Sequence, residues 1–238
     1  MIKVENLSFG YEKNNTVLNN LAFEIGQGET VGIIGANGCG KSTLLKVLVG
    51  LLLFDGKVTV CGLEVEKKNY SEIRKKVGYV LQDSDNQLFM SKVKEDIAFA
   101  PRNYGYSESE IEEISAEAMN MVGIGHLKDR QNTKLSGGEK KLASIAVVLA
   151  MQPDIMLLDE PTNGLDPYNR RKIINVLKEL PQTKLIASHD LDLIYDTCDR
   201  VILLSGGEIK ADGDINTILK NRELLESHHL ELPLRFQQ

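Results

Sequence analysis

Apolar and polar residues partly alternate over the first 25 residues, a pattern typical of strands with one buried face. The stretches IKVENLSFGY (2–11) and TVLNNLAFEI (16–25) predict two strands, and Asn14–Asn15 between them predicts a turn. The run TVGIIG (30–35) is apolar and rich in β-branched residues, which favours a strand buried on both faces. We therefore expect an N-terminal antiparallel β-subdomain followed by a buried strand.

Helical and strand patterns alternate along the rest of the chain. A short helix and then a strand ending at Gln82 are predicted within 71–82, and a hairpin is predicted over 200–213. Helical patterns cover 41–52, 93–122, 136–150 and 166–180, and strand patterns cover 56–65, 154–160 and 184–188. The residues from 214 onward are polar and helix-prone. Strands that alternate with helices predict an α/β fold with a mostly parallel sheet.

Composition narrows the class of protein. The 238 residues are 42% apolar and 26% charged, and the net charge of −6 argues against a nucleic-acid partner, whose surface usually meets a basic field. Cys39, Cys61 and Cys198 are too few and too scattered for a disulfide framework or a zinc site, which favours a reducing compartment. No signal peptide is visible, and the longest apolar run, 142–151, is shorter than the roughly twenty residues of a membrane span. We expect a soluble chain that is able to dock on a membrane protein.

The stretch GANGCGKST (35–43) matches the P-loop pattern G-x-x-x-x-G-K-[ST], and it lies between a predicted strand and a predicted helix, as that motif requires. Glycines let backbone N–H groups close around phosphate oxygens, and the helix N-terminus adds positive potential. Lys41 is expected to reach the β- and γ-phosphates of ATP, Ser42 to hold Mg²⁺ and Thr43 to donate to the α-phosphate. The alternative is a glycine-rich turn that enters a core helix. The predicted nucleotide-binding residues of this loop are Gly35, Ala36, Asn37, Gly38, Cys39, Gly40, Lys41, Ser42 and Thr43.

The stretch IMLLDEP (155–161) places two carboxylates at the end of an apolar strand. Parallel sheets bind their ligands at the carboxyl ends of the strands. Asp159 is therefore expected in the Mg²⁺ shell, and Glu160 is expected to be the base that polarises the attacking water. Helix capping after a strand is the alternative, and the P-loop upstream argues against it.

The stretch LSGGEKKLASIAVVLA (135–150) predicts a helix with an unusual start. Ser136 and Glu139 have the spacing of a capping box. Gly137 and Gly138 between them lower the helix propensity of the first turn. Something is therefore expected to approach this backbone closely.

The order of LSGGEKK (135–141), IMLLDEPTNGLDP (155–167) and LIASHD (185–190) resembles the ATP-binding cassette (ABC) ATPase family over nearly the whole chain. The resemblance implies one ABC ATPase domain (1–238) with a P-loop NTPase core, a helical subdomain at 83–152 and a C-terminal tail at 214–238. It also implies that two such chains pair head to tail. The phosphate contacts that one chain then offers to the ATP of the other are Ser136, Gly137 and Gly138. Glu139 stands where glutamine is commoner, and it is expected to cap the helix or face outward because it would repel phosphate.

Four further positions take their expected roles from this resemblance. Tyr11 resembles the aromatic residue that stacks on adenine, although a strand-end tyrosine is the alternative. Gln82 resembles the glutamine that touches Mg²⁺ and water, although a satisfied strand-end amide is the alternative. Asp166 resembles the aspartate at the dimer seam, although its proline neighbour also fits a simple helix start. His189 resembles the switch histidine that contacts the γ-phosphate and orients Glu160 or water.

Three weaker matches point to one branch of the family. LQDSDNQLF (81–89), VKEDIAFAPRNYG (93–105) and ELLESHHLELP (223–233) resemble ATPases of the energy-coupling-factor and cobalt-type importers. This likeness implies a homodimer or heterodimer of cassettes at the cytoplasmic face of the cell membrane, below a membrane scaffold subunit and a substrate-capture membrane subunit. The cargo would be a vitamin or a transition-metal ion (cobalt or nickel). Apolar Leu88, Phe89 and Met90 fit a docking groove near Gln82, or ordinary core packing.

Other functions fit the sequence less well. ABC proteins of DNA repair insert a long coiled coil, and no sustained heptads separate Lys41 from Ser136. ABC proteins of translation usually carry two cassettes in one chain, and this chain shows one. A regulatory binder that does not hydrolyse ATP would be expected to lack Glu160 or His189, and both are present.

Overall fold

Two sheets form the framework of the computed structural model, which describes residues 1–12 and 15–237. Asn14 of the predicted turn therefore lies outside the described residues. The smaller sheet is antiparallel with strand order β2-β1-β4-β5, which confirms the N-terminal subdomain. Its strands are β1 (Ile2–Glu12), β2 (Asn15–Ile25), β4 (Asp55–Val60) and β5 (Leu63–Glu64). The single strand predicted over 56–65 was wrong, because Cys61 and Gly62 take φ values of 51° and 78° and turn the chain.

The larger sheet has the order β10-β9-β3-β8-β7-β6. The pairs from β9 to β6 are parallel and the β9–β10 hairpin is antiparallel, which confirms an α/β fold with a mostly parallel sheet. The strands are β3 (Thr30–Ile34), β6 (Val77–Val80), β7 (Ile155–Asp159), β8 (Thr183–Ala187), β9 (Arg200–Ser205) and β10 (Glu208–Asp214). Parallel strands end at the same edge, so the residues that follow β3, β7 and β8 can meet there.

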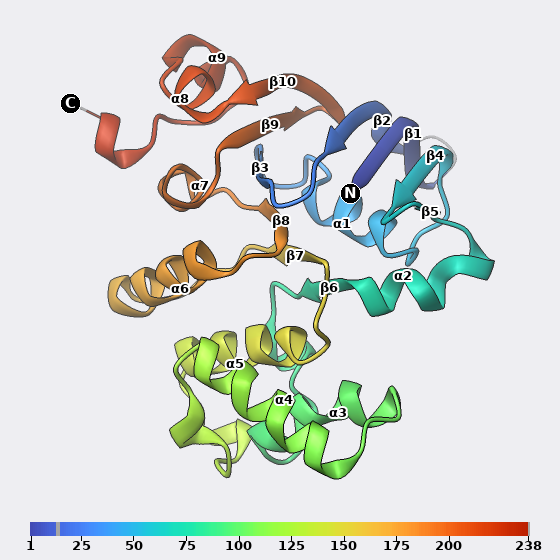
Figure 1. Cartoon of the computed structure of the whole chain (residues 1–238). Coiled ribbons are helices and arrows are strands. Elements are labelled where there is room, and N and C mark those ends of the chain that lie inside the picture. Colours follow the sequence, from blue (N-terminus) through green and yellow to red (C-terminus); the bar gives the residue numbers. More distant parts are fainter. Residues whose placement is uncertain (13–14, 238) are drawn as a thin grey trace.

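The larger sheet separates two hydrophobic cores. Along β7, Met156 and Leu158 face the core shared with the helices of the lower half of Figure 1. Ile155 and Leu157 face the core shared with the antiparallel sheet. Since successive side chains of a strand point to opposite faces, one apolar run supplies both cores.

Nine α-helices surround these sheets in the part of the chain that the structure describes (Figure 1). They are α1 (Lys41–Leu48), α2 (Tyr70–Lys76), α3 (Val93–Asn103), α4 (Glu108–Met121), α5 (Gly137–Leu149), α6 (Pro167–Glu179), α7 (Leu191–Thr197), α8 (Ile215–Leu219) and α9 (Arg222–Ser227). Helices α3, α4 and α5 pack together at the end of the molecule opposite the antiparallel sheet (Figure 1). These helices fall within the predicted helical subdomain, and its existence as a separate unit stays a prediction. Within the described ranges, no helix combines the length and apolar character needed to cross a membrane.

Several predicted boundaries were wrong. Helix α1 ends four residues before the predicted end, close to Gly50, whose φ is 66°. Strand β6 ends at Val80, two residues before Gln82. Helix α7 was missed, although α2, which is also seven residues long, was predicted.

Candidate active site

The loop between β3 and α1, residues 35–43, forms an open cradle at the start of a helix. Gly40 precedes α1 with a left-handed φ of 108°, and a Cβ atom there would lie 2.6 Å from Leu18 Cδ2. A Cβ atom on Gly35 would lie 2.1 Å from the carbonyl oxygen of Leu204, so this position also requires glycine. No side chain caps α1, and its first turn contains no acidic residue. The N–H groups of its first turn are therefore available to an anion such as phosphate. We call residues 35–43 the phosphate cradle.

A cavity of about 640 Å³ opens over the cradle. It brings together most of the predicted ATP-contacting residues, although they come from distant parts of the sequence. The lining residues are Tyr11, Val17, Asn37, Gly38, Gly40, Lys41, Ser42, Thr43, Gln82, Glu160, Asn163 and His189. Gly35, Ala36 and Cys39 belong to the same loop but lie outside this lining.

Tyr11 stands at the rim of this cavity. Its side chain is 58% exposed, its hydroxyl lies 3.2 Å from Thr43 Oγ1, and its ring meets Phe9 edge-to-face at 4.8 Å between centroids. The arrangement leaves aromatic surface next to the cradle. Stacking of adenine on this ring stays a prediction.

Lys41 is buried inside the cradle. Its Nζ donates to the carbonyl oxygens of Gly35 (2.8 Å) and Ala36 (3.3 Å) and lies 4.0 Å from Glu160 Oε1. A bound phosphate would offer this ammonium stronger, charge-assisted bonds than the two carbonyl groups do.

The oxygen atoms around Asp159 fit a magnesium ion. Ser42 Oγ donates to Asp159 Oδ1 at 2.9 Å, and the Tyr79 hydroxyl donates to Asp159 Oδ2 at 3.0 Å. Burial, followed by the Asp159 charge, raises the pKa of the Tyr79 phenol, so it remains a donor. Mg²⁺ prefers hydroxyl, carboxylate and water oxygens. Ser42 and Gln82 line the 640 Å³ cavity, and Asp159 lies outside that lining but is bonded to Ser42. Ser42, Asp159 and Gln82 would hold the ion, which would neutralise phosphate charge.

Glu160 is held in a strained backbone conformation directly after β7. Its φ of 45° is rare for a residue other than glycine, and such strain costs on the order of 1–3 kcal/mol. The side chain is only 6% exposed, and Oε2 accepts a bond from Ser188 Oγ at 2.9 Å. His189 Nδ1 lies 2.9 Å from the same oxygen, and the His189 N–H donates to the carboxylate at 3.1 Å. The structure therefore joins the predicted base and the predicted switch histidine.

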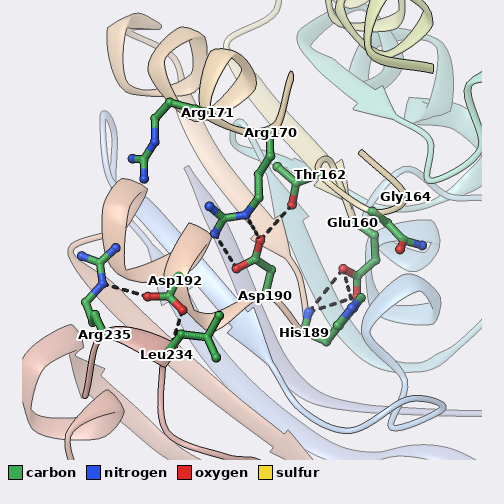
Figure 2. A pocket seen from close by; sticks show the side chains of 11 residues that line it. Glu160, Thr162, Gly164, Arg170, Arg171, His189, Asp190, Asp192, Leu234 and Arg235 are labelled. Atoms are coloured by element: carbon green, nitrogen blue, oxygen red, sulfur yellow. Dashed lines mark hydrogen bonds and ion pairs between the residues drawn. The ribbon is translucent and has the colours of Figure 1, made fainter. Parts of the chain in front are cut away.

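A second cavity of about 490 Å³, shown in Figure 2, lies on the other side of Glu160 and His189. Asp190 caps α7 and accepts bonds from Arg170 Nε (2.6 Å) and Nη2 (2.8 Å) (Figure 2). Burial opposes ionisation of Asp190, but the bonds from Arg170 hold the pKa of its carboxyl below its ordinary value. Arg235 Nε donates to Asp192 Oδ1 at 2.8 Å, so the C-terminal segment is also bonded to α7 (Figure 2). The turn carrying His189 is thus fixed from two sides.

The predicted phosphate-covering turn begins α5. We call its residues Ser136, Gly137 and Gly138 the lid turn. Ser136 Oγ accepts from the Glu139 N–H at 3.3 Å, and Glu139 Oε2 accepts from the Ser136 N–H at 2.7 Å, which confirms the capping box. Bonds from Ser136 lower the pKa of the Glu139 carboxyl, which also contacts Arg130 at 3.2 Å.

The two glycines of the lid turn differ in their surroundings. Gly137 is exposed, and a Cβ there would meet only Leu165, at 3.9 Å. Gly138 is buried, and a Cβ there would lie 2.3 Å from Asn169 Cγ. Close packing within the same chain therefore gives a reason for Gly138 that is independent of any phosphate. Asn169 provides that packing surface, and Asp166 holds it by accepting bonds from the Asn169 N–H (3.0 Å) and Nδ2 (2.6 Å) as it caps α6.

None of the lid-turn residues, nor Asp166, is among the described residues that line the 640 Å³ cavity. The cradle and the lid turn of one chain therefore do not share a site.

A family model described as "ABC transporter" matches residues 18–163, more than half of the chain. The chain belongs to the ABC transporter ATP-binding proteins. As an ABC ATPase it is the ATP-hydrolysing subunit of a transporter.

Relatives of this ABC ATPase cover its whole length. A Geobacter sulfurreducens protein, GSU1281, named provisionally as an ABC transporter ATP-binding protein, is 44% identical over 238 residues, covering 100% of this chain and 96% of its own. The energy-coupling factor transporter ATP-binding protein EcfA of Methanothermobacter thermautotrophicus is 43% identical, covering 98% of this chain and 77% of its own.

Solved structures show the same fold. CbiO1 of Clostridium perfringens, described as part of the ABC transporter complex cbiONQ, superposes with a TM-score of 0.86 at 36% identity, covering 95% of this chain and 93% of its own. The ATP-binding cassette MJ0796, solved as a dimer bound to ADP and Pi, gives a TM-score of 0.80 at 27% identity, covering 90% of this chain and 99% of its own.

Sequence reasoning missed several side chains that shape this ABC ATPase site. Tyr79 and Ser188 each bond to a predicted catalytic or metal-binding carboxylate, yet they follow no spacing that would identify them. The sequence predicts no role for Lys141, and the structure shows that its side chain is buried. Burial lowers its pKa to about 8, which keeps most of its charge at pH 7. Its neighbours Leu81 and Gln82 are distant in sequence, so only the fold reveals the contact.

Proposed function

We propose that this ABC ATPase drives an importer of the energy-coupling-factor or cobalt type, and that its cargo is a vitamin or a transition-metal ion. The observation that carries the proposal is the likeness of nearly the whole chain to a protein named EcfA, together with the fold of CbiO1. Both likenesses extend beyond the nucleotide site, since they cover 98% and 95% of this chain.

ATP hydrolysis would require two chains in a head-to-tail pair. The cradle and the lid turn of one chain do not line a common cavity, so a second chain, identical or related, would supply the lid turn. The exposed Ser136 hydroxyl and the exposed Gly137 backbone suit contact with the outer phosphate of the nucleotide in the other cradle. Closure would thus be driven by binding energy, and hydrolysis would reopen the pair.

Within each cradle the residues would divide the chemistry. Lys41 would bind the β- and γ-phosphates, while Glu160 accepts a proton from the attacking water. Ser188 and His189 would fix the Glu160 carboxylate toward that water, as their bonds to Oε2 indicate. Mg²⁺ would be held by Ser42, Asp159 and Gln82, and it supplies charge neutralisation when bound.

The membrane scaffold subunit would dock beside the segment after Gln82. Phe89 is 62% exposed and meets Phe99 edge-to-face at 5.0 Å, so these rings offer an apolar contact. Leu88 is buried in the core, which matches the alternative of ordinary core packing for this residue. Asp96 holds the loop by accepting the N–H groups of Phe89 (3.0 Å) and Met90 (3.1 Å). The chain would accordingly sit peripherally on the cytoplasmic face of the membrane.

Two measurements test this proposal. The chain purified from its native membrane in mild detergent should bring with it a scaffold subunit and a small substrate-capture protein, identified by mass spectrometry. Hydrolysis of MgATP by the isolated chain should rise more steeply than linearly with protein concentration, because only dimers are complete. Recovery of ribosomes or DNA-repair proteins in place of membrane subunits would favour a soluble ABC ATPase.

A further inference from the structure

Lys141 is a buried lysine to which the proposed mechanism gives no role. Its side chain lies on the second turn of α5 and is only 3% exposed. Nζ donates to the carbonyl oxygens of Leu81 (2.9 Å) and Gln82 (2.8 Å), just past the end of β6. Burying an ammonium group is costly unless its donors are satisfied. The two bonds therefore hold Lys141 firmly to this backbone.

Gln87 makes a second connection between the same two segments. Its Oε1 accepts from the Leu81 N–H at 3.0 Å, and its Nε2 donates to the Ser144 carbonyl of α5 at 3.2 Å. Both the N–H and the C=O of Leu81 are thus tied to α5, directly by Lys141 and indirectly by Gln87. We call this arrangement the Leu81 latch.

The latch joins two functional segments that are otherwise far apart in the sequence. Gln82 lines the nucleotide cavity of this chain, whereas the lid turn begins the helix that carries Lys141. Lys141 follows Gly137 by four residues, which is about one helical turn. A helix moves as a rigid element, so displacement of Gln82 either moves the lid turn or breaks buried, charge-assisted bonds.

We propose that Lys141 and Gln87 are positioning residues that transmit the occupancy of a chain's own cradle to the lid turn that it offers to the second chain. This inference rests on the proposed pairing of two chains. The latch would couple the two nucleotide sites, because each chain contributes a cradle to one site and a lid turn to the other.

Amide hydrogen exchange tests the latch without any hydrolysis. At a concentration where the chain sediments as a monomer, MgATP should change the exchange rate of residues 137–140 by about fivefold or more, the lower end of typical allosteric coupling. In Lys141→Met, MgATP affinity should stay within about twofold of the wild-type value, while this exchange response disappears. An unchanged response in a folded Lys141→Met chain would overturn the proposal, as would a wild-type chain that shows no response.

Hydrolysis gives a second readout and Lys140 gives a matched control. Lys141→Met should lower kcat about tenfold and leave KM within about twofold, because the latch acts after binding. Lys140→Met removes the neighbouring lysine, whose pair with the exposed Asp85 at 2.6 Å also joins α5 to this segment but is screened by solvent, so both kcat and the exchange response should persist. If Lys141→Met fails to fold, Gln87→Leu carries the same expectations and the same refutation. A wild-type chain that hydrolyses MgATP without concentration dependence would refute the pairing itself, a result distinct from a latch variant that behaves like wild type.

Discussion

Helices α1 and α5 both begin with glycine-containing turns, but their N-termini are satisfied in opposite ways. Helix α1 has no side-chain cap, a left-handed Gly40 at its start and the buried Lys41 as its first residue. Helix α5 has a complete capping box made by Ser136 and Glu139. The cradle thus leaves N–H donors for a ligand, whereas the lid turn meets part of its own hydrogen-bonding need.

This difference shows why the cradle can be prepared in advance and the lid cannot. Anion binding at α1 would exchange the two bonds of Lys41 to carbonyl oxygens for bonds to a charged phosphate. At α5 the Ser136 hydroxyl accepts a bond from Glu139, and it can still donate its own hydrogen to a phosphate from another chain.

Glu160→Gln should lower kcat about a thousandfold, because it removes the general base while keeping the size of the side chain. MgATP binding should persist, and the variant should accumulate as a dimer in MgATP, measured by sedimentation. If the variant stays monomeric in MgATP even when its membrane partners are present, the role of the lid turn is contradicted.

Lys41→Ala should weaken MgATP binding about a hundredfold, which equals about 2.7 kcal/mol. The loss reflects the charge-assisted bonds that Lys41 would make to phosphate. Isothermal titration provides the measurement, and Lys46→Ala on the same helix is the control. Equal affinities of the Lys41 variant and the wild type would show that the cradle does not bind through this lysine.

Alanine substitutions should have different effects at the two lid-turn glycines, one on stability and the other on hydrolysis. Gly138→Ala should lower the free energy of unfolding by about 1–3 kcal/mol, because its Cβ would press against Asn169. Gly137→Ala has open space and should change that free energy by less than about 1 kcal/mol. It should nevertheless lower kcat about tenfold if this backbone contacts phosphate. Urea unfolding and steady-state hydrolysis measure the two effects, and full activity of Gly137→Ala would argue against the contact.

Cys39 reports on occupancy of the cradle. Burial raises the pKa of its thiol, so maleimide labelling should be slow at pH 7 and accelerate by about tenfold per pH unit below that pKa, since the thiolate reacts. MgATP should protect Cys39, whereas Cys61 in the turn between β4 and β5 should be labelled at the same rate with or without nucleotide. Peptide mapping distinguishes the two thiols. If complete modification of Cys39 leaves ATP binding intact, this residue is not part of the nucleotide site.

Glu139→Gln should have the smallest effect. Glutamine at this position preserves the capping box, and only the exposed contact with Arg130 is lost, for a change of less than about 1 kcal/mol. Because its pKa is lowered in the folded chain, Glu139 stabilises fully above its ordinary pKa and loses this contribution as the pH falls through the lowered value. The variant should lack that part of the acid dependence in thermal unfolding between pH 5 and pH 3, roughly the range around a carboxyl pKa.

The sequence could predict the elements whose signals are local. Strands β1 and β2 follow from alternation, β3 from a buried apolar run, and the strand–loop–helix of the cradle from its motif. Each of these signals lies within about ten residues, and the fold confirmed the elements that they predict. The ends of α1 and β6 were misplaced because tertiary packing, rather than periodicity, decides where they stop. The contacts of Tyr79 and Lys141 join residues 59 or more positions apart, which no spacing rule addresses.

The left-handed backbone of Glu160 has a consequence for protein engineering. A search for stabilising substitutions would be expected to favour glycine or asparagine at this position, since both tolerate such a φ angle with less strain. Either replacement would remove the carboxylate. Selection for heat resistance alone would therefore tend to lower the rate of hydrolysis. The chain gives up some folding stability to keep the Glu160 carboxylate in its orientation.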